Sequence, residues 1–348
     1  MDHRPKNKKG SKSLVHSPWS VVHGPLSTVL SAIKTGRRFL VVSHYHPDGD
    51  ALGSTLALGL SLKKLEKKVV MYNRDRVPYN LKYLPASSSI TQTLPNISFD
   101  YTFIVDCAQP KRVSDDFAKA LEAKRLGKLL CLDHHLLDYK VGDVDWIDPK
   151  AASTGCVIWK LLKTLKLHKN KDIANLVYCT LTVDTGSFRY SNTTADVFKM
   201  AGELLRYGAD PWLAARNLEE SNPSERYVLL GLALRSLFVG MNGEYASMDV
   251  TQSMLKESGA GDDLSEDFAN YPRSIKGVEV SALFREMEDL RIKVSLRSKL
   301  RVDVSKVAKS FGGGGHVHAA GCILRCDLTS AKKQIETEVR KKLKNKKF

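Results

Sequence analysis

Short apolar runs alternate with helical patterns over the first part of the chain. The runs are FLVV (39–42), KVVMY (68–72), TFIVD (102–106) and KLLCL (128–132). Between them, residues 50–65 and 114–125 carry apolar positions at helical spacing. Buried parallel strands read as unbroken apolar runs and need a helical crossover from one strand to the next. The pattern therefore predicts an α/β fold with a doubly wound, mostly parallel sheet.

The rest of the chain predicts a helical connector and a smaller α/β domain. Residues 153–167 and 172–183 read as helices, the first opened by a Ser/Thr cap, and 194–238 is helical with Gly and Pro interruptions. Strand-like pieces and a glycine run follow Val239. The expected divisions are a basic tail (1–20), the doubly wound domain (21–205), the connector (206–238), the smaller domain (239–330) and a basic C-terminal helix or tail (331–348).

The chain is strongly basic. Lysine and arginine number 54 against 38 acidic residues, for a formal charge of +16. Residues 3–47 contain no acidic side chain, and the chain ends in KKLKNKKF. Such a charge attracts polyanions, although solvated tails explain basic ends equally well.

Cysteine usage and hydropathy predict a soluble cytoplasmic protein. The six cysteines are scattered, form no CxxC pair and sit mostly in apolar runs, as is typical of a reducing compartment. No apolar run approaches the roughly 18 residues that a membrane span needs. Targeting to an organelle by the acid-poor N-terminus is left open.

Carboxylates and imidazoles gather where the predicted strands end. His44, His46, Asp48 and Asp50 follow the first run, Asp106 ends the third, Asp133, His134 and His135 follow the fourth, and Asp184 ends an apolar helix. A lone Asp-Gly is more often a turn, and a lone His-His is more often surface or core. The carboxyl ends of parallel strands meet in one crevice, however, so three such clusters are expected to converge.

The expected site is rich in oxygen ligands and strongly negative, so it requires cations. Carboxylates with imidazoles and no thiolate favour Mn²⁺, with Mg²⁺ or Co²⁺ as alternatives, over a structural zinc. Cys107 is out of phase with the ligand face. The number of ligands predicts two metals, which about 4 Å apart can activate water for in-line displacement at phosphorus.

The assembled motifs resemble the DHH phosphoesterase family. SHYHPDGDALGS, VDCAQPKRV, LDHH and TVDTGSFRYSNTT match its four catalytic motifs in order, and FGGGGHVHAAG (311–321) matches the glycine-rich motif of the DHH-associated domain. The resemblance covers about residues 26–325. The compact two-domain length and NYPRSIKGVEVSALFRE resemble the NrnA-type subfamily, which degrades oligoribonucleotides of a few nucleotides and dephosphorylates 3′-phosphoadenosine 5′-phosphate (PAP).

The resemblance implies a ligand set. One metal is expected on His44, Asp48 and Asp106, and the other on Asp50, Asp106, His134 and Asp184. Asp133 is expected to orient His134, and His135 to face the scissile phosphate. His46 occupies a variable position of the motif and is left out.

The resemblance also implies substrate contacts in the smaller domain. Consecutive glycines let a backbone approach a ligand closely, so Gly313, Gly314 and Gly315 with His316 are expected to hold the nucleotide. Arg189, Arg273 and Arg297 are further candidates for phosphate or base contacts, because guanidinium pairs well with phosphate. Each of these arginines is equally compatible with a structural or surface role.

The expected function is hydrolysis of short oligoribonucleotides to mononucleotides and dephosphorylation of PAP. Hydrolysis of cyclic or linear dinucleotides, and polyphosphatase or pyrophosphatase activity, are alternatives within related catalytic domains. A non-catalytic nucleic-acid-binding module is the alternative of another class. The expected partners are the RNA and nucleotide substrates, with no membrane, and homodimer formation is left open.

Overall fold

The computed structural model describes residues 24–107, 109–136 and 139–344. The expected N-terminal tail (1–20) and the last four residues lie outside them. The chain divides into two compact units, Met1–Leu218 and Glu219–Phe348. Helix α8 (Ser224–Arg235) belongs to the second unit in this division. The expected helical connector (206–238) stays a prediction. Among the described residues, no helix is both long and apolar enough to cross a bilayer.

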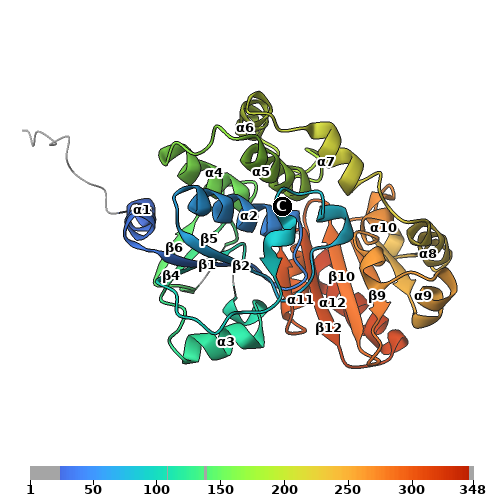
Figure 1. Cartoon of the computed structure of the whole chain (residues 1–348). Helices are drawn as coiled ribbons and strands as arrows, with labels where there is room; N and C mark the ends of the chain where they lie inside the picture. The colour runs from blue at the N-terminus through green and yellow to red at the C-terminus, as the bar shows by residue number, and fades with distance from the viewer. Residues whose placement is uncertain (1–23, 108, 137–138, 345–348) are drawn as a thin grey trace, which may run out of the picture. The chain divides into compact units, whose positions relative to one another are not determined.

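The first unit is built on a six-stranded, all-parallel sheet in the order β3-β2-β1-β4-β5-β6 (Figure 1). The strands are β1 (Arg38–Val42), β2 (Lys68–Tyr72), β3 (Ile90–Thr91), β4 (Tyr101–Val105), β5 (Lys128–Asp133) and β6 (Val144–Ile147). The chain runs outward from β1 to β2 and β3, then returns to place β4 on the other side of β1. The order therefore reverses between β1 and β4, where sheets of this kind bind ligands.

Helices cover both faces of this sheet, which confirms the doubly wound α/β prediction. They are α1 (Pro25–Thr35), α2 (Gly49–Lys64), α3 (Asp115–Glu122), α4 (Thr154–Thr164), α5 (Lys171–Asp184), α6 (Ala195–Arg206) and α7 (Pro211–Leu218). Alternate residues of β1 enter different cores: Phe39 and Val41 pack with α1, α2, α4 and α5, and Leu40 and Val42 pack with α3. Because both faces are buried, the strand is apolar at every position after Arg38.

Glycines allow α2, α4 and α5 to pack closely beside the sheet. A Cβ on Gly53 of α2 would lie 2.8 Å from the Leu176 carbonyl oxygen of α5. A Cβ on Gly155 of α4 would lie 1.9 Å from Thr180 Oγ1 of α5, far closer than real Cβ contacts. The first turns of α2 and α4 and the last turn of α5 are thereby brought together, and the polar residues described below lie in these turns.

The second unit contains a mixed six-stranded sheet in the order β11-β12-β10-β9-β8-β7, as expected of a smaller α/β domain. Its strands are β7 (Phe238–Gly240), β8 (Tyr245–Val250), β9 (Val280–Glu286), β10 (Ile292–Ser298), β11 (Gly314–His316) and β12 (Ala319–Leu324). Its helices are α8, α9 (Gln252–Ser258), α10 (Asn270–Ser274), α11 (Val304–Lys309) and α12 (Leu328–Lys344). One face of β9 and β10 packs against α11 and α12 through a single apolar core.

Candidate metal centre

The turn after β1 places a buried imidazole and a carboxylate beside Asp106. The His44 ring donates from Nδ1 to the Tyr45 carbonyl oxygen at 2.8 Å, which leaves Nε2 facing Asp106 Oδ2 at 3.6 Å. Asp48 caps α2 by accepting the backbone N–H groups of Asp50 and Ala51, each at 3.0 Å. One ligand atom each from His44, Asp48 and Asp106 lie within 4.8 Å of one another.

Asp50 is fully buried and is held by the first turn of α4. Its carboxylate accepts the backbone N–H groups of Thr154 at 2.7 Å and Gly155 at 3.0 Å, and the Ser54 hydroxyl at 3.1 Å. The expected Ser/Thr cap is therefore corrected: Ser153 stands at the N-cap but makes no capping hydrogen bond through its side chain. The N–H groups at the start of α4 instead donate to Asp50 of α2. The positive end of the α4 dipole favours this anion.

Asp106 follows β4 and lies at the centre of the cluster. Its backbone is in the left-handed region (φ 51°), and its Oδ1 accepts the Thr154 hydroxyl at 3.0 Å. Three imidazoles surround its carboxylate: Asp106 oxygens lie 3.6 Å from His44 Nε2, 3.7 Å from His134 Nε2 and 3.5 Å from His135 Nδ1. The close approach of all three rings depends on this strained turn at the end of the strand.

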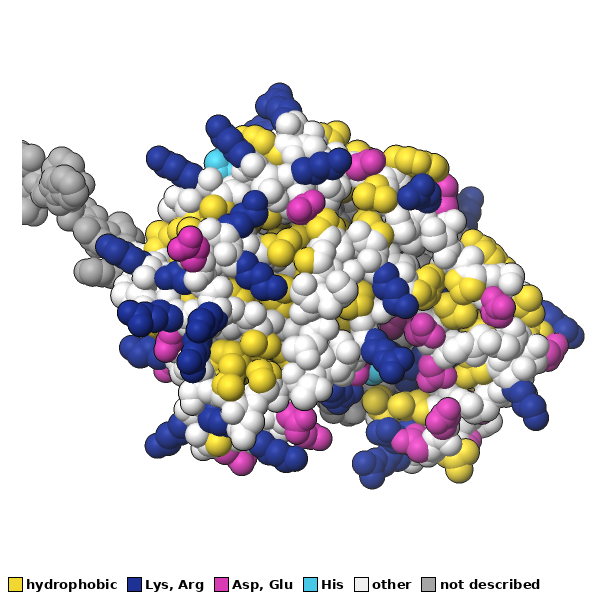
Figure 2. All heavy atoms as spheres, viewed as in Figure 1, with side chains coloured by type: hydrophobic (Ala, Val, Ile, Leu, Met, Phe, Trp, Pro, Cys, Tyr) yellow, Lys and Arg dark blue, Asp and Glu magenta, His cyan; other side chains and the backbone are white. Residues whose placement is uncertain are grey.

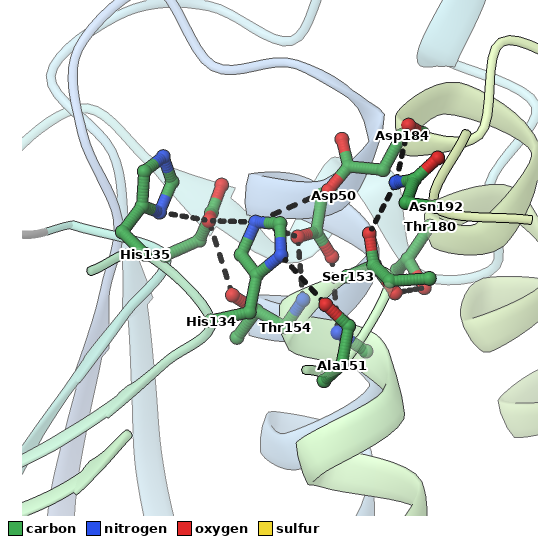
Figure 3. A network of polar contacts seen from close by, with 12 residues as sticks. Asp50, His134, His135, Ala151, Ser153, Thr154, Thr180, Asp184 and Asn192 are labelled. Atoms are coloured by element: carbon green, nitrogen blue, oxygen red, sulfur yellow. Dashed lines mark hydrogen bonds and ion pairs between the residues drawn. The ribbon is translucent and has the colours of Figure 1, made fainter. Parts of the chain in front are cut away.

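His134 faces the second set of carboxylates (Figure 3). Its Nδ1 lies 3.3 Å from the Ala151 carbonyl oxygen, and its Nε2 lies 3.2 Å from Asp184 Oδ2 and 3.8 Å from Asp50 Oδ2. Asp184 is the last residue of α5, and its carbonyl oxygen accepts the Asn192 amide at 3.0 Å. One ligand atom each from Asp50, His134 and Asp184 also lie within 4.8 Å of one another.

Asp133 contacts a different imidazole from the one expected. Its Oδ1 accepts the backbone N–H groups of His134 and His135 and lies 2.7 Å from Nδ1 of the His135 ring. It therefore orients the ring of His135, and it holds His134 through the main chain. The chain turns directly after β5, so that both the backbone N–H and the ring of His135 face the Asp133 carboxylate. The ring of His134 faces the Ala151 carbonyl oxygen instead.

Burial and mutual repulsion shift the pKa values of this cluster in opposite directions. Burial, followed by the charge of Asp106, raises the pKa of Asp50 to about 7, and burial with the charge of Asp50 raises that of Asp184. Burial also raises the pKa of Asp106, but the His44 hydrogen bond and the surrounding imidazoles outweigh it and hold the value well below its usual range. Burial lowers the pKa of His135. The hydrogen bond to Asp133 and the charges of the nearby carboxylates have the opposite and larger effect, so the pKa is raised to about 9.

The donor set fits divalent cations. Oδ2 of Asp133 and Oδ2 of Asp184 are buried and accept no hydrogen bond from the described residues. Buried carboxylate oxygens without donors are costly unless a cation faces them. Asp106 belongs to both the group with His44 and a group with His134, so two cations sharing it would each find three or more oxygen and nitrogen ligands.

Without metal, the protein is expected to lose stability as the pH rises from about 5 to 9. The folded state binds a proton at Asp50 more tightly than the unfolded chain does, so this contribution is lost between pH 3.8 and about 7. The contribution of His135 is present below pH 6.5 and is lost as the pH passes about 9. Thermal unfolding in EDTA at several pH values measures the trend. Added Mn²⁺ should raise the Tm more at pH 8.5 than at pH 5.5, because protons compete for its ligands. An unchanged or rising Tm in EDTA would contradict it.

The three expected arginines make local contacts. Arg189 is exposed, and its Nε donates to the Gly186 carbonyl oxygen at 2.6 Å. Arg273 is half-buried in α10, and Arg297 on β10 donates to the Leu296 carbonyl oxygen and lies 3.9 Å from Asp267. Of the residues in the first unit that the sequence prediction did not include, Thr154 stands out, since it contacts both Asp50 and Asp106. Its signal was the Ser-Thr-Gly at the start of a helix, which was read only as a cap.

The glycine run forms part of a β-hairpin. Gly314 and His316 are the ends of β11, which pairs with β12. A Cβ on Gly313 would lie 2.1 Å from the Gly321 carbonyl oxygen, and one on Gly315 would lie 2.5 Å from that of Ala319. A Cβ on Gly314 would have no described atom within 4 Å. The close approach of β12 thus accounts for two of these glycines, and Gly314 is the one that faces open space.

Comparison with known proteins finds two domain families and several full-length relatives. The model of the DHH family, N-terminal domain, matches residues 38–181, and that of the DHHA1 domain matches residues 245–345. The chain is 32% identical to the bifunctional oligoribonuclease and PAP phosphatase NrnA of Thermus thermophilus, over 87% of this chain and 89% of the relative. It is 27% identical to the protein of the same name from Bacillus subtilis, over 80% and 86% of the two chains. Among solved structures, it is similar to an exopolyphosphatase-related protein from Bacteroides fragilis, with a TM-score of 0.84, 26% identity and coverage of 91% and 96%.

Proposed function

Because this chain belongs to the DHH phosphoesterase family, we propose that it hydrolyses short oligoribonucleotides to mononucleotides and removes a phosphate from PAP. The observation that carries the proposal is the meeting of two donor groups on Asp106, which fits a pair of divalent cations beside a strand-end crevice. The names and full-length coverage of the two relatives support the choice of substrates.

The proposed ligand set starts from the group of His44, Asp48 and Asp106 and the group of Asp50, His134 and Asp184. Asp106 is added to the second group because its Oδ1 lies 3.7 Å from His134 Nε2. His44, Asp48 and Asp106 would hold one cation, and Asp50, Asp106, His134 and Asp184 the other, with Mn²⁺ as the proposed metal. Bound there, such ions supply Lewis-acid activation of a water molecule and neutralise charge on the phosphate. The first turn of α4 holds Asp50 in place by two N–H groups, and Thr154 holds Asp106 by its hydroxyl. These residues keep the carboxylates oriented before substrate arrives, which is a large part of a site's catalytic power.

His135 is the proposed acid at the phosphate. Its side chain is 23% exposed, whereas that of His134 is 8% exposed, and Asp133 fixes its ring through Nδ1. The hydrogen bond from Nδ1 to Asp133 favours the protonated ring, which can donate a proton to a phosphate oxygen or to the leaving alkoxide. In the hydrolysis, the oxygen of water bonds to phosphorus and the P–O bond to the leaving group breaks. The leaving alkoxide gains a proton and departs as an alcohol.

Contacts to the nucleotide are proposed at the glycine run and at three arginines. Gly314 faces open space beside Gly313, Gly315 and His316, as a backbone surface for a ligand requires. Arg189, Arg273 and Arg297 are proposed for phosphate or base contacts. We also propose a cytoplasmic location, in keeping with six cysteines that form no disulfide. Homodimer formation stays a prediction.

Hydrolysis of a substrate panel tests the proposed function. The purified protein is incubated with Mn²⁺ and, separately, an RNA dinucleotide, a 24-nucleotide RNA, PAP, cyclic-di-AMP and inorganic polyphosphate. Turnover of the dinucleotide and PAP well above that of the other three, and its loss in EDTA, is the expected result. Preference for cyclic-di-AMP or polyphosphate would replace the proposed substrates, and no turnover with Mn²⁺, Mg²⁺ or Co²⁺ would overturn the assignment.

Asp184→Asn is expected to lower kcat on the dinucleotide by about 100-fold or more, because it removes a charged ligand from the group with Asp50 and His134. The matched control is Asp172→Asn, an exposed aspartate in the first turn of the same helix. That variant should keep kcat within about threefold. Steady-state kinetics at saturating Mn²⁺ measures both, and equal rates in the two variants would remove Asp184 from the proposed ligand set.

A further inference from the structure

Basic side chains gather at the edge of the first unit's sheet where the strands begin. Segments 34–38, 63–68 and 122–128 lead into β1, β2 and β5, and together they carry ten lysines and arginines against two glutamates. All strands of a parallel sheet begin at one edge, so these segments are neighbours in space. Figure 2 shows dark-blue side chains gathered on the side of the molecule where α1 lies. These three segments with Asp100 and Tyr101 of the loop into β4 are called the basic edge.

The strand register locates three charges of the basic edge along the sheet. Arg38 pairs with Lys68 on β2, and Lys128 pairs with Tyr101 on β4, the strand between β1 and β5. Neighbouring strands lie about 4.8 Å apart, so Lys68, Arg38 and Lys128 extend over about 14 Å. The three side chains are exposed. Tyr101 also pairs with Phe39, so Lys128 lies on the opposite sheet face from Arg38 and Lys68. The three cations form a row that crosses the rim of the sheet from one face to the other, and such a charged rim attracts a chain of phosphates.

A shallow hollow of about 420 Å³ lies within the basic edge. It is lined by Thr35, Gly36, Arg37, Asp100, Tyr101 and Lys128. The one carboxylate there is already engaged, because Asp100 Oδ2 accepts the backbone N–H groups of Arg37 at 2.7 Å and Arg38 at 2.9 Å, which lower its pKa. Tyr101 lines the hollow with a half-buried ring that is stacked on Phe39, with 5.8 Å between the ring centroids.

The basic edge lies too far from the candidate metal centre to belong to it. The metal-ligating residues follow the carboxyl ends of β1, β4 and β5, whereas the basic edge precedes their amino ends. A strand of five residues is about 17 Å long. A dinucleotide held at the cluster around Asp106 cannot also lie along the row of Lys68, Arg38 and Lys128.

We propose that the basic edge is a second binding surface, for the phosphate backbone of single-stranded RNA longer than the hydrolysed substrates. Among the described residues, none of the exposed large apolar side chains lies in its segments, so it lacks the anchors that hold a protein in an anionic bilayer. The row ends at β6, where the acidic side chains of Asp143 and Asp145 accept backbone N–H groups.

RNA binding at the basic edge would retain the enzyme on long RNA, from which short fragments arise. The proposal does not depend on which phosphoester is hydrolysed.

The test is a triple charge reversal in the full-length chain, Arg38→Glu/Lys68→Glu/Lys128→Glu. Fluorescence anisotropy with a labelled 24-nucleotide RNA measures binding, in EDTA so that the RNA is not hydrolysed. The variant should bind at least tenfold more weakly. The slope of log affinity against log salt should be about 2 units shallower, since each contact with a single strand contributes about 0.7. Hydrolysis of the dinucleotide and the Tm should be unchanged.

The matched control reverses three exposed cations of the same unit away from the basic edge, Lys166→Glu/Lys169→Glu/Arg206→Glu. It carries the same change in net charge and should weaken RNA binding by less than threefold. Three results would overturn the proposal: wild-type affinity in the basic-edge variant, equal losses in the two variants, or failure of the wild-type chain to bind the RNA. A chain lacking residues 1–23 should still bind the 24-mer more tightly than the basic-edge variant does. Binding to vesicles containing anionic lipid but not to RNA would assign the surface to membranes instead.

Discussion

Replacing Asp106 with asparagine is expected to lower kcat on the RNA dinucleotide by about 1,000-fold or more. Among the described residues, Asp106 is the one whose ligand atoms fall in both the group with His44 and a group with His134. Asparagine keeps the volume and can still accept the Thr154 hydroxyl, but it removes the charge that two cations would share. Steady-state kinetics across a Mn²⁺ titration measures the effect, and calorimetry should show that metal affinity falls with it.

Asp75→Asn is the control for this substitution. Asp75 follows β2 at the same edge of the sheet and accepts the His46 backbone N–H at 2.6 Å, yet it belongs to none of the ligand groups found among the described residues. Its variant should keep kcat within about threefold. In EDTA, Asp106→Asn should unfold below the wild-type temperature, because the contacts with the surrounding imidazoles that lower the Asp106 pKa outweigh its repulsion with Asp50. An Asp106→Asn enzyme within tenfold of wild type would contradict the shared role of this carboxylate.

Replacing Gly155 with alanine is expected to destabilise the protein by about 1–3 kcal/mol and to reduce activity as well. The added Cβ would lie 1.9 Å from Thr180 Oγ1 and 2.7 Å from Thr180 Cβ, so α4 and α5 must separate. The Gly155 N–H would then withdraw from Asp50, and Asp184 at the end of α5 would shift relative to it. Thermal unfolding and kinetics of the dinucleotide reaction measure the two effects, and loss of residues that orient metal ligands costs about 10- to 100-fold.

Gly202→Ala provides the matched control for Gly155→Ala. Gly202 lies within α6, and a Cβ placed there meets no described atom within 4 Å. Alanine at this position should raise stability by about 0.5–1 kcal/mol, because glycine is a poor helix former. Adding Thr180→Ala to Gly155→Ala removes the nearest clashing atom and should restore part of the loss. Equal stability of the two single variants would contradict the packing explanation.

In the first unit, the apolar pattern was sufficient for the strands buried on both faces and insufficient for the edge strands. β1, β2, β4 and β5 were predicted within one residue of their observed starts, because both of their faces lie in a core. β3 has two residues, and every residue of β6 is only half-buried, so neither leaves a clear apolar run. In the second unit, β7 is largely exposed and pairs only with β8, and it was missed for the same reason.

The sequence by itself determined the fold class and the residue types of the candidate metal centre. Continuous apolar runs require two covered faces, and polar side chains placed after three such runs must meet at the edge where parallel strands end. The family resemblance predicted which of these residues hold which metal. The membership of the family is shown by relatives that match most of the chain.

Only the tertiary structure decided how those ligands are held. Two of these contacts join segments far apart in the chain: Asp50 accepts N–H groups of α4, and Asp106 accepts the Thr154 hydroxyl. The third, between Asp133 and the ring of His135, depends on the path of the turn after β5. A sequence pattern reports how often a face is buried, but not which donor lies opposite which acceptor. That choice is made when Gly53 and Gly155 let three helices approach, because it depends on differences of an ångström between packed backbones.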